Sequence, residues 1–153
     1  MSDPRSIEAR IRVLEDHHDI AALVARHQDV ADQKDFDSWP DILTDDIVVE
    51  FPFASHTGRD GIAEWGRNAL AIFEATFHMQ SNLILEIDGD TARGRTTAWA
   101  VGIARAESRR RTFEEGGVYQ WTFRRTSEGW RIAKLSFAAT WATDMDNTGL
   151  AGN

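Results

Sequence analysis

Apolar residues recur along the chain with two different periods, and the change of period predicts the order of its elements. Over residues 7 to about 31 they follow the spacing of an amphipathic helix. A shorter helical pattern covers residues 35–43, a β-branched strand pattern covers 45–53, and a further helical pattern covers 61–76. The pattern then alternates at every second residue, and turn residues divide it into strands at 78–87, 91–106, 112–126 and 130–142.

The order of these elements predicts an α+β fold in a single domain, because the helices come first and the long strands follow. Hairpin turns between the strands predict an antiparallel meander, and Gly116-Gly117 predicts a β-bulge in one of them. We expect the sheet to curve into a cone, with the N-terminal helices on its concave face and a pocket between the layers. The domain should span residues 1–153, with an ordered core over about 7–142 and a flexible tail over 143–153.

Composition and charge narrow the classes of function. The net charge of −8 argues against nucleic acid or an anionic membrane as a partner. The chain has no cysteine, which rules out disulfides and thiolate chemistry. Its N-terminal residues are charged, and no apolar run is long enough for a signal peptide or a membrane span. We therefore expect a cytoplasmic protein whose partner is a small molecule.

Histidines are the strongest candidates for chemistry, and two of the five stand out by their positions. No pair has the spacing of a helical metal site, so we expect no metal. His78 opens the first long strand and shares a face with Gln80 and Asn82, which suits a cavity wall as well as a core position. His27 lies on the apolar stripe of the first helix near Val24, where a structural role and a functional role both remain open.

A histidine that acts as a base needs a partner that fixes its tautomer, and a carboxylate serves this purpose. Asp32 and Asp35 both lie near the end of the first predicted helix. The helical periodicity does not choose between them.

Several segments together resemble a known family. They are "IAALVARHQDVADQKDFDSWPDILTDDIVVEF", "GRDGIAEW", "FHMQSNLILEIDGDTARGRT" and "GVYQWTFRRTSEGWRIAKLSF". In this order they resemble the SnoaL-like group of the nuclear transport factor 2-like fold, whose architecture is a cystatin-like α+β barrel. Within that group the sequence is most similar to the branch of scytalone dehydratase, bile-acid dehydratases and hexachlorocyclohexane dehydrochlorinase.

The resemblance implies a site and a class of reaction. In that branch an aspartate at the end of the first helix pairs with a histidine that opens the first long strand, and no metal or organic cofactor takes part. These positions match Asp32 and His78. The helix position five residues before the aspartate, which in that branch often carries a polar or basic group aimed at the leaving group, matches His27. The resemblance implies a lyase of the dehydratase or dehydrohalogenase type, with the dyad as general base on a small apolar or aromatic substrate. A cyclase or isomerase with the same dyad, or a non-catalytic binding or assembly module, is the alternative.

The sequence also departs from the branch. The dehydrochlorinase-like pattern has an arginine in the final strand where this chain has Lys134-Leu135, and the scytalone dehydratase-like pattern has paired tyrosines where this chain has Tyr119 alone. The substrates of those enzymes therefore do not transfer. We expect a homo-oligomer, a dimer or trimer, formed through the open face of the sheet. The candidate substrate contacts are Tyr119, Asn82, Trp99, Trp121, Phe137, Trp39 and Phe53.

Overall fold

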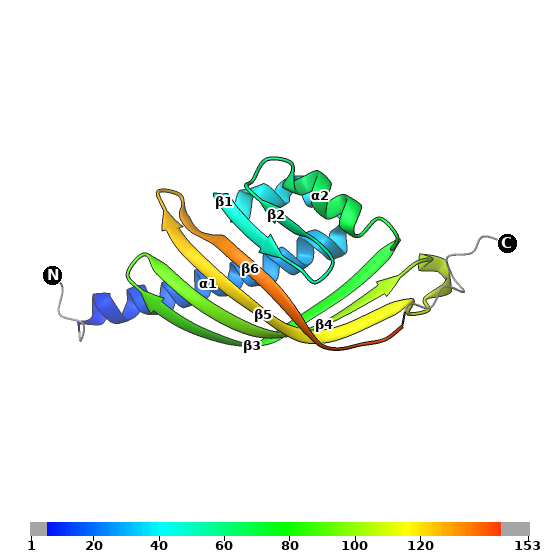
Figure 1. Cartoon of the computed structure of the whole chain (residues 1–153). Helices are drawn as coiled ribbons and strands as arrows, with labels where there is room; N and C mark the ends of the chain where they lie inside the picture. The colour runs from blue at the N-terminus through cyan, green and yellow to red at the C-terminus, as the bar shows by residue number, and fades with distance from the viewer. Residues whose placement is uncertain (1–5, 145–153) are drawn as a thin grey trace.

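The computed structural model describes residues 6–144 and shows helices packed on the concave side of a curved sheet (Figure 1). The helical elements are α1 (Ile7–Gln33), the 3-10 helix η1 (Phe36–Ile42), α2 (Ile62–Ala69) and the short 3-10 helix η2 (Ala106–Ser108). The strands are β1 (Leu43–Glu50), β2 (Ser55–Thr57), β3 (Ala75–Asp88), β4 (Thr91–Ile103), β5 (Phe113–Thr126) and β6 (Gly129–Ala142). The predicted α+β class and the curved sheet are confirmed.

The sheet has six strands in the order β2-β1-β6-β5-β4-β3. Strands β3 to β6 form the predicted antiparallel meander, and the register of β5 against β6 shifts between Gly116 and Gly117, where a bulge was predicted. The sheet as a whole is mixed, because β1, outside the meander, runs parallel to β6, with Val49 opposite Leu135. The periodicity of a strand marks its buried face, but the direction of its neighbour depends on how the helical layer returns the chain to the sheet.

Two local predictions between β1 and β3 also need correction. The helix expected over residues 61–76 ends at Ala69, and the Lys34 ammonium donates to the carbonyl oxygens of Leu70 (3.5 Å) and Phe73 (3.0 Å) just beyond it. A side chain from α1 thus satisfies the carbonyls of this turn, which a sequence pattern within 61–76 cannot show. The turn expected after β1 contains the short strand β2, whose His56 lies opposite Val49.

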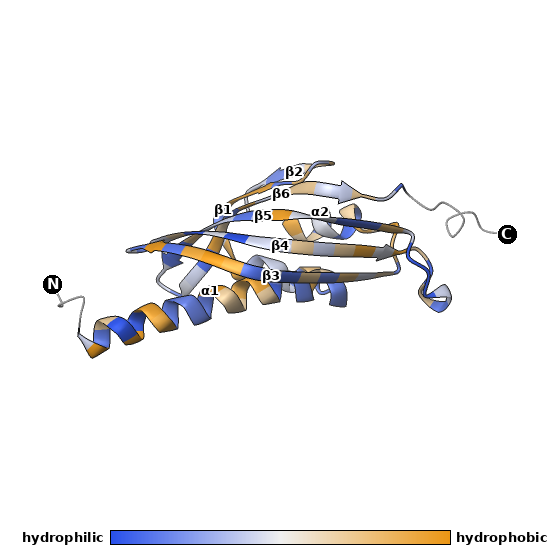
Figure 2. Cartoon of the chain, turned by 90° about the horizontal axis from the view of Figure 1, so that it is seen from below, coloured by the Kyte–Doolittle hydropathy of each residue, from blue (hydrophilic) through white to orange (hydrophobic). Residues whose placement is uncertain are grey.

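The apolar stripe of α1 packs on the sheet over its C-terminal half. Ile20 and Val24 are buried against a core that includes Trp121, Phe123 and Ile132. Each such side chain contributes about 1.5–3 kcal/mol when it is fully buried. The N-terminal part of α1 extends past the sheet (Figures 1 and 2), and its apolar residues Ile7, Ile11 and Leu14 are exposed.

A buried carboxylate fastens α1 to the hairpin between β5 and β6. Asp16 accepts hydrogen bonds from Arg125 (2.7 Å) and from the indole nitrogen of Trp130 (2.9 Å). These bonds lower the pKa of Asp16, with the Arg125 bond as the largest cause. This contact fixes where α1 lies along its axis relative to the sheet, and therefore where the residues at its C-terminal end are placed.

A backbone hydrogen bond joins the first residue of the predicted tail to β5. Thr143 was assigned to the tail, but its backbone N–H donates to the carbonyl oxygen of Glu114 at 2.9 Å. The rest of the predicted tail, from residue 145 onward, lies outside the described residues. No helix in the described part of the chain is long and apolar enough to cross a membrane.

Candidate active site

The C-terminal end of α1 and the start of β3 bring Asp32 and His78 together. The Nδ1 atom of His78 lies 2.6 Å from Asp32 Oδ1, and the backbone N–H of His78 donates to Asp32 Oδ2 at 2.9 Å. The hydroxyl of Thr76 lies 2.9 Å from Asp32 Oδ1 and completes the set of donors. Asp35, the alternative carboxylate, instead faces Arg26 and Ser38 on the surface.

This arrangement sets the chemistry of the imidazole. With a proton on Nδ1 directed at Asp32, the lone pair of Nε2 faces away from the aspartate. The side chain of His78 is 14% exposed and lines the space between the helices and the sheet. Such an Asp–His pair can accept a proton at Nε2, because the carboxylate stabilises the imidazolium that forms.

Two adjoining cavities, of about 90 and 350 Å³, lie between the helices and the concave face of the sheet. They exist because small residues occupy the middle of this face. Ala98 pairs with Gly117, and Ala100 lies between His78 on β3 and Glu115 on β5. The residues common to both cavities are Phe53, Ala69, Leu70, His78, Ala100 and Glu115.

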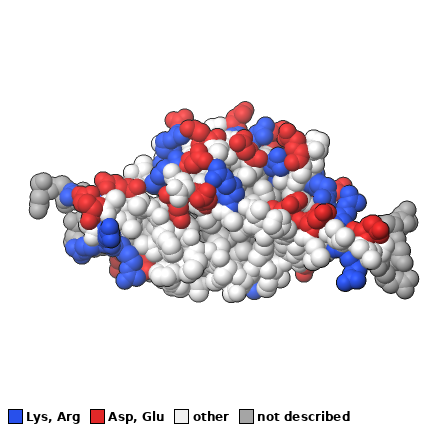
Figure 3. All heavy atoms as spheres, turned by 180° about the vertical axis from the view of Figure 1, so that it is seen from behind, with Lys and Arg blue, Asp and Glu red and all other residues white. Residues whose placement is uncertain are grey.

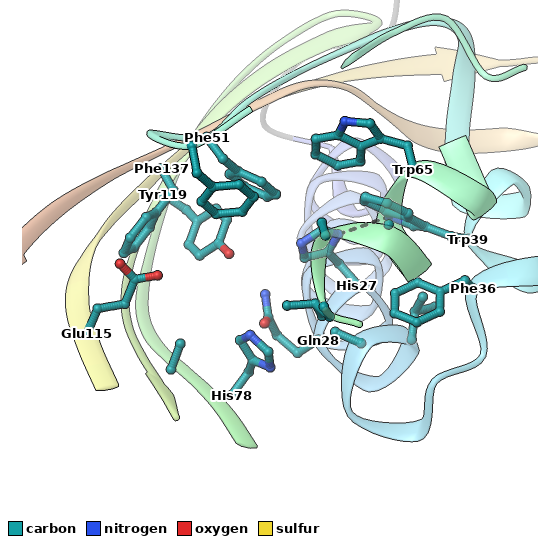
Figure 4. Close-up of a pocket in the computed structure, with 17 residues that line it drawn as sticks. His27, Gln28, Phe36, Trp39, Phe51, Trp65, His78, Glu115, Tyr119 and Phe137 are labelled. Atoms are coloured by element: carbon teal, nitrogen blue, oxygen red, sulfur yellow. Dashed lines mark hydrogen bonds between the residues drawn. The ribbon is translucent and has the colours of Figure 1, made fainter. Parts of the chain in front are cut away.

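His27 projects from α1 into the inner cavity, one and a half helical turns before Asp32. Its Nδ1 atom accepts a hydrogen bond from the indole N–H of Trp39 at 3.2 Å (Figure 4). Burial, followed by the charge on His78, lowers the pKa of His27 from 6.5 to about 3. His27 is therefore neutral at ordinary pH and carries its proton on Nε2, the nitrogen that Figure 4 shows directed toward Tyr119.

Gln28 and Tyr119 extend this group of donors. The Gln28 side chain is buried, and its Nε2 has no hydrogen-bond partner among the described residues. Burial raises the pKa of Tyr119, and Glu115 raises it further when its carboxyl is charged, while a hydrogen bond with Gln28 lowers it; burial is the largest cause, so the phenol stays protonated. The inner cavity thus offers N–H and O–H donors at one end and the Nε2 lone pair of His78 at the other.

Glu115 is a polar residue of the site that sequence reasoning missed. It lines both cavities, and burial raises the pKa of its carboxyl, an effect that the charge on His78 opposes. The signal was present in the sequence, because Glu115 precedes Tyr119 by four residues on an alternating strand and therefore shares its face.

The predicted substrate contacts divide into two groups. Tyr119, Phe137, Trp39 and Phe53 line the inner cavity. Trp121 is buried in the core, with its indole N–H on Thr96, and does not line either cavity. Trp99 lies on the opposite face of the sheet against Phe77, because the inward residue of this part of β4 is Ala100.

Asn82 is also misplaced by the prediction. Strand alternation put it on the face of His78, but the register of β3 shifts between Ser81 and Ile84, and Asn82 adopts a left-handed backbone with φ of 56°. It is exposed and lies outside both cavities. A bulge of one residue reverses the face that a side chain occupies, and the alternating pattern alone treats Asn82, a residue type that tolerates a left-handed backbone, as a regular strand position.

The charged groups that could support other chemistry lie elsewhere. Lys134 is on the surface, 3.0 Å from Glu50. Among the described residues that line the two cavities there is no lysine or arginine. No group of three or more His, Cys, Asp or Glu side chains in residues 6–144 is arranged to hold a metal ion.

The chain belongs to the family of SnoaL-like domains, whose model matches residues 12–136. It is 29% identical over 125 residues to an uncharacterised protein of Mycobacterium tuberculosis, a match that covers 79% of this chain and 83% of that protein. Among solved structures, it is similar to an NTF2-like protein with a cystatin-like fold from Novosphingobium aromaticivorans, with 28% identity, a TM-score of 0.76 and 92% of each chain covered. A hexachlorocyclohexane dehydrochlorinase, LinA type 2, shares the fold at 20% identity and a TM-score of 0.76, over 90% of this chain and 92% of that chain.

Proposed function

We propose that this protein is a lyase of the dehydratase or dehydrohalogenase type, with His78 as the general base and Asp32 as its orienting partner. The observation that carries the proposal is the Asp32–His78 pair, held at 2.6 Å and open to a mainly apolar cavity. Membership of a fold family that includes a dehydrochlorinase supports it further. The apolar lining favours a small aromatic or aliphatic substrate.

In this proposal, Nε2 of His78 removes a proton from a carbon atom next to a carbonyl group of the substrate. The electron pair of the broken C–H bond moves into the developing enolate, and a group on the neighbouring carbon leaves as the double bond forms. Asp32 stabilises the imidazolium through the Nδ1 hydrogen bond. The Nε2–H of His27 and the unpartnered amide N–H of Gln28 donate to the enolate oxygen, an arrangement that acts where negative charge develops.

Proton removal can be tested separately from elimination. Benzylacetone carries a carbonyl, an aromatic ring and exchangeable α-protons but no leaving group. Wild-type protein should exchange these protons for deuterium in D₂O, and His78→Ala and Asp32→Asn should each exchange about 10²–10⁴-fold more slowly, as followed by NMR. His17→Ala, a change at an exposed histidine of α1, is the matched control and should leave the rate unchanged.

Equal exchange rates in wild type and His78→Ala would refute the proposed base. The product of a turnover substrate then separates the reaction classes by mass. Loss of water or hydrogen halide lowers the mass, whereas cyclisation or isomerisation leaves it unchanged.

A further inference from the structure

Glu115 and His78 face one another across a single small residue of the sheet. His78 on β3 pairs with Ala100 on β4, and Ala100 pairs with Glu115 on β5. All three side chains lie on the concave face, because all three line both cavities. Neighbouring strands are about 4.8 Å apart, so the Cα atoms of His78 and Glu115 are roughly 10 Å apart. Ala100 between them carries only a methyl group, and Figure 4 shows open space between the side chains of His78 and Glu115.

The environment of the Glu115 carboxyl favours its protonated form. No group in the described part of the chain donates a hydrogen bond or forms an ion pair with it, in contrast to Glu114, which accepts from Arg111 and from the indole of Trp99. Burial raises the pKa of Glu115, and among the nearby titratable groups His78 opposes this shift when it is charged. A carboxyl group in such a setting can donate a proton to a bound molecule.

We propose that Glu115 is a second catalytic residue, the general acid that protonates a departing hydroxyl group, and that the substrate is a β-hydroxy carbonyl compound with an apolar or aromatic substituent. This inference rests on the proposed function, since it assigns the partner of the base His78. With Glu115 as the acid, the proposed reaction is loss of water rather than loss of a halide.

The step balances in atoms and charge. His78 Nε2 takes the α-proton, and the C–H electron pair moves into the enolate. The enolate then re-forms the carbonyl group as its electron pair forms the new C=C bond and the C–O bond breaks. The departing oxygen takes the electron pair of that bond and the proton of Glu115, and it leaves as water. His78 is then an imidazolium and Glu115 a carboxylate, which attract one another across Ala100. Transfer of the proton from His78 back to Glu115 through water restores the starting state.

The residues at the two ends of the cavity favour a hydroxyl group over a halide as the leaving group. Hydroxide is a poor leaving group and needs a proton as the C–O bond breaks, whereas a halide leaves as a weakly basic anion and needs none. A halide is instead helped by a cation, and no lysine or arginine lines either cavity in the described part of the chain. A protonated carboxyl group across from the base serves only the hydroxyl substrate.

Two probes with the same carbon skeleton test this assignment. They are the aldol of benzaldehyde with acetone and its β-chloro analogue, both of which give the ultraviolet-absorbing product benzylideneacetone. Glu115→Gln keeps the size of the side chain but cannot transfer a proton. It should lower kcat on the aldol about 10²–10⁴-fold and change kcat on the chloride by less than about threefold. Glu114→Gln, the same change on the opposite face of β5, should leave both rates unchanged.

The outcomes separate the inference from the proposed function. Loss of activity on both probes in His78→Ala together with loss on the aldol alone in Glu115→Gln supports both assignments. Equal losses on the two probes in Glu115→Gln, no loss on either, or wild-type turnover of the chloride alone would overturn the acid role and leave the base intact. If wild-type protein turns over neither probe, both proposals fail.

A second measurement needs no substrate. The carboxyl carbon of Glu115, labelled with ¹³C and assigned by its absence in Glu115→Gln, should titrate above the ordinary glutamate value of 4.5. Titration at or below that value, as expected of a carboxylate kept charged to hold a cationic ligand, would overturn the assignment.

Discussion

Part of the loss of stability on acidification should come from the buried His27. Its pKa is about 3 in the folded protein and 6.5 in an exposed reference state, because burial penalises the imidazolium. The unfolded chain therefore binds more protons than the folded chain between these two values, and the free energy of unfolding falls as the pH is lowered through this window. From about pH 7 to about pH 5 the expected loss due to His27 is about 2 kcal/mol.

The assay compares two substitutions of the same kind on one helix. His27→Gln removes the titrating group and keeps an oxygen that can accept the N–H of Trp39, while His17→Gln changes an exposed histidine. Urea unfolding near both pH values gives the free energy of unfolding of each variant. Wild type and His17→Gln should lose about 2 kcal/mol more than His27→Gln on acidification, since all carboxylates are common to the three proteins.

A pH dependence that is the same in His27→Gln as in wild type would refute the reasoning. It would mean that His27 is protonated in the folded protein, or that water reaches it. In that case its Nε2–H would no longer be a neutral donor to an enolate, and the role proposed for His27 would fail with it.

Further predictions concern packing, an ion pair and assembly. Gly117→Ala should destabilise the fold by about 1–3 kcal/mol in urea unfolding, because a Cβ there meets the backbone of β6 at the bulge. Asp16→Ala should cost about 1–3 kcal/mol by the same measurement, since it leaves the buried indole N–H of Trp130 without its partner, while Arg125 keeps its bond to Asp90. Figure 3 shows few Lys, Arg, Asp or Glu side chains over the lower middle of the molecule. If the protein self-associates through the outer face of the sheet, where Phe77, Met79 and Trp99 are exposed, Trp99→Lys should lower its mass in sedimentation equilibrium. An unchanged mass would contradict that interface.

Much of the fold follows from local patterns in the sequence. The period of apolar residues placed α1 and the four long strands β3 to β6, because burial of one helical stripe and one strand face demands that spacing. The Gly116-Gly117 pair predicted the bulge in β5 correctly. Glycine is needed there because side chains at these positions would meet Trp141 and the backbone of β6. The helical wheel placed His27 on the buried stripe but left its role open.

Only the tertiary structure decided the chemistry of the site. Asp32 and His78 are 46 residues apart, and the family resemblance pointed to Asp32, but only the meeting of the end of α1 with the start of β3 places the two side chains in contact. The neutral tautomer of His27 depends on Trp39, a residue on a separate element. Asn82 lies outside the cavities because the register of β3 shifts at this position, and the strand register places Glu115 across Ala100 from His78. Periodicity reports which face of an element is buried, whereas a pKa and a hydrogen bond depend on what the neighbouring element brings to that face.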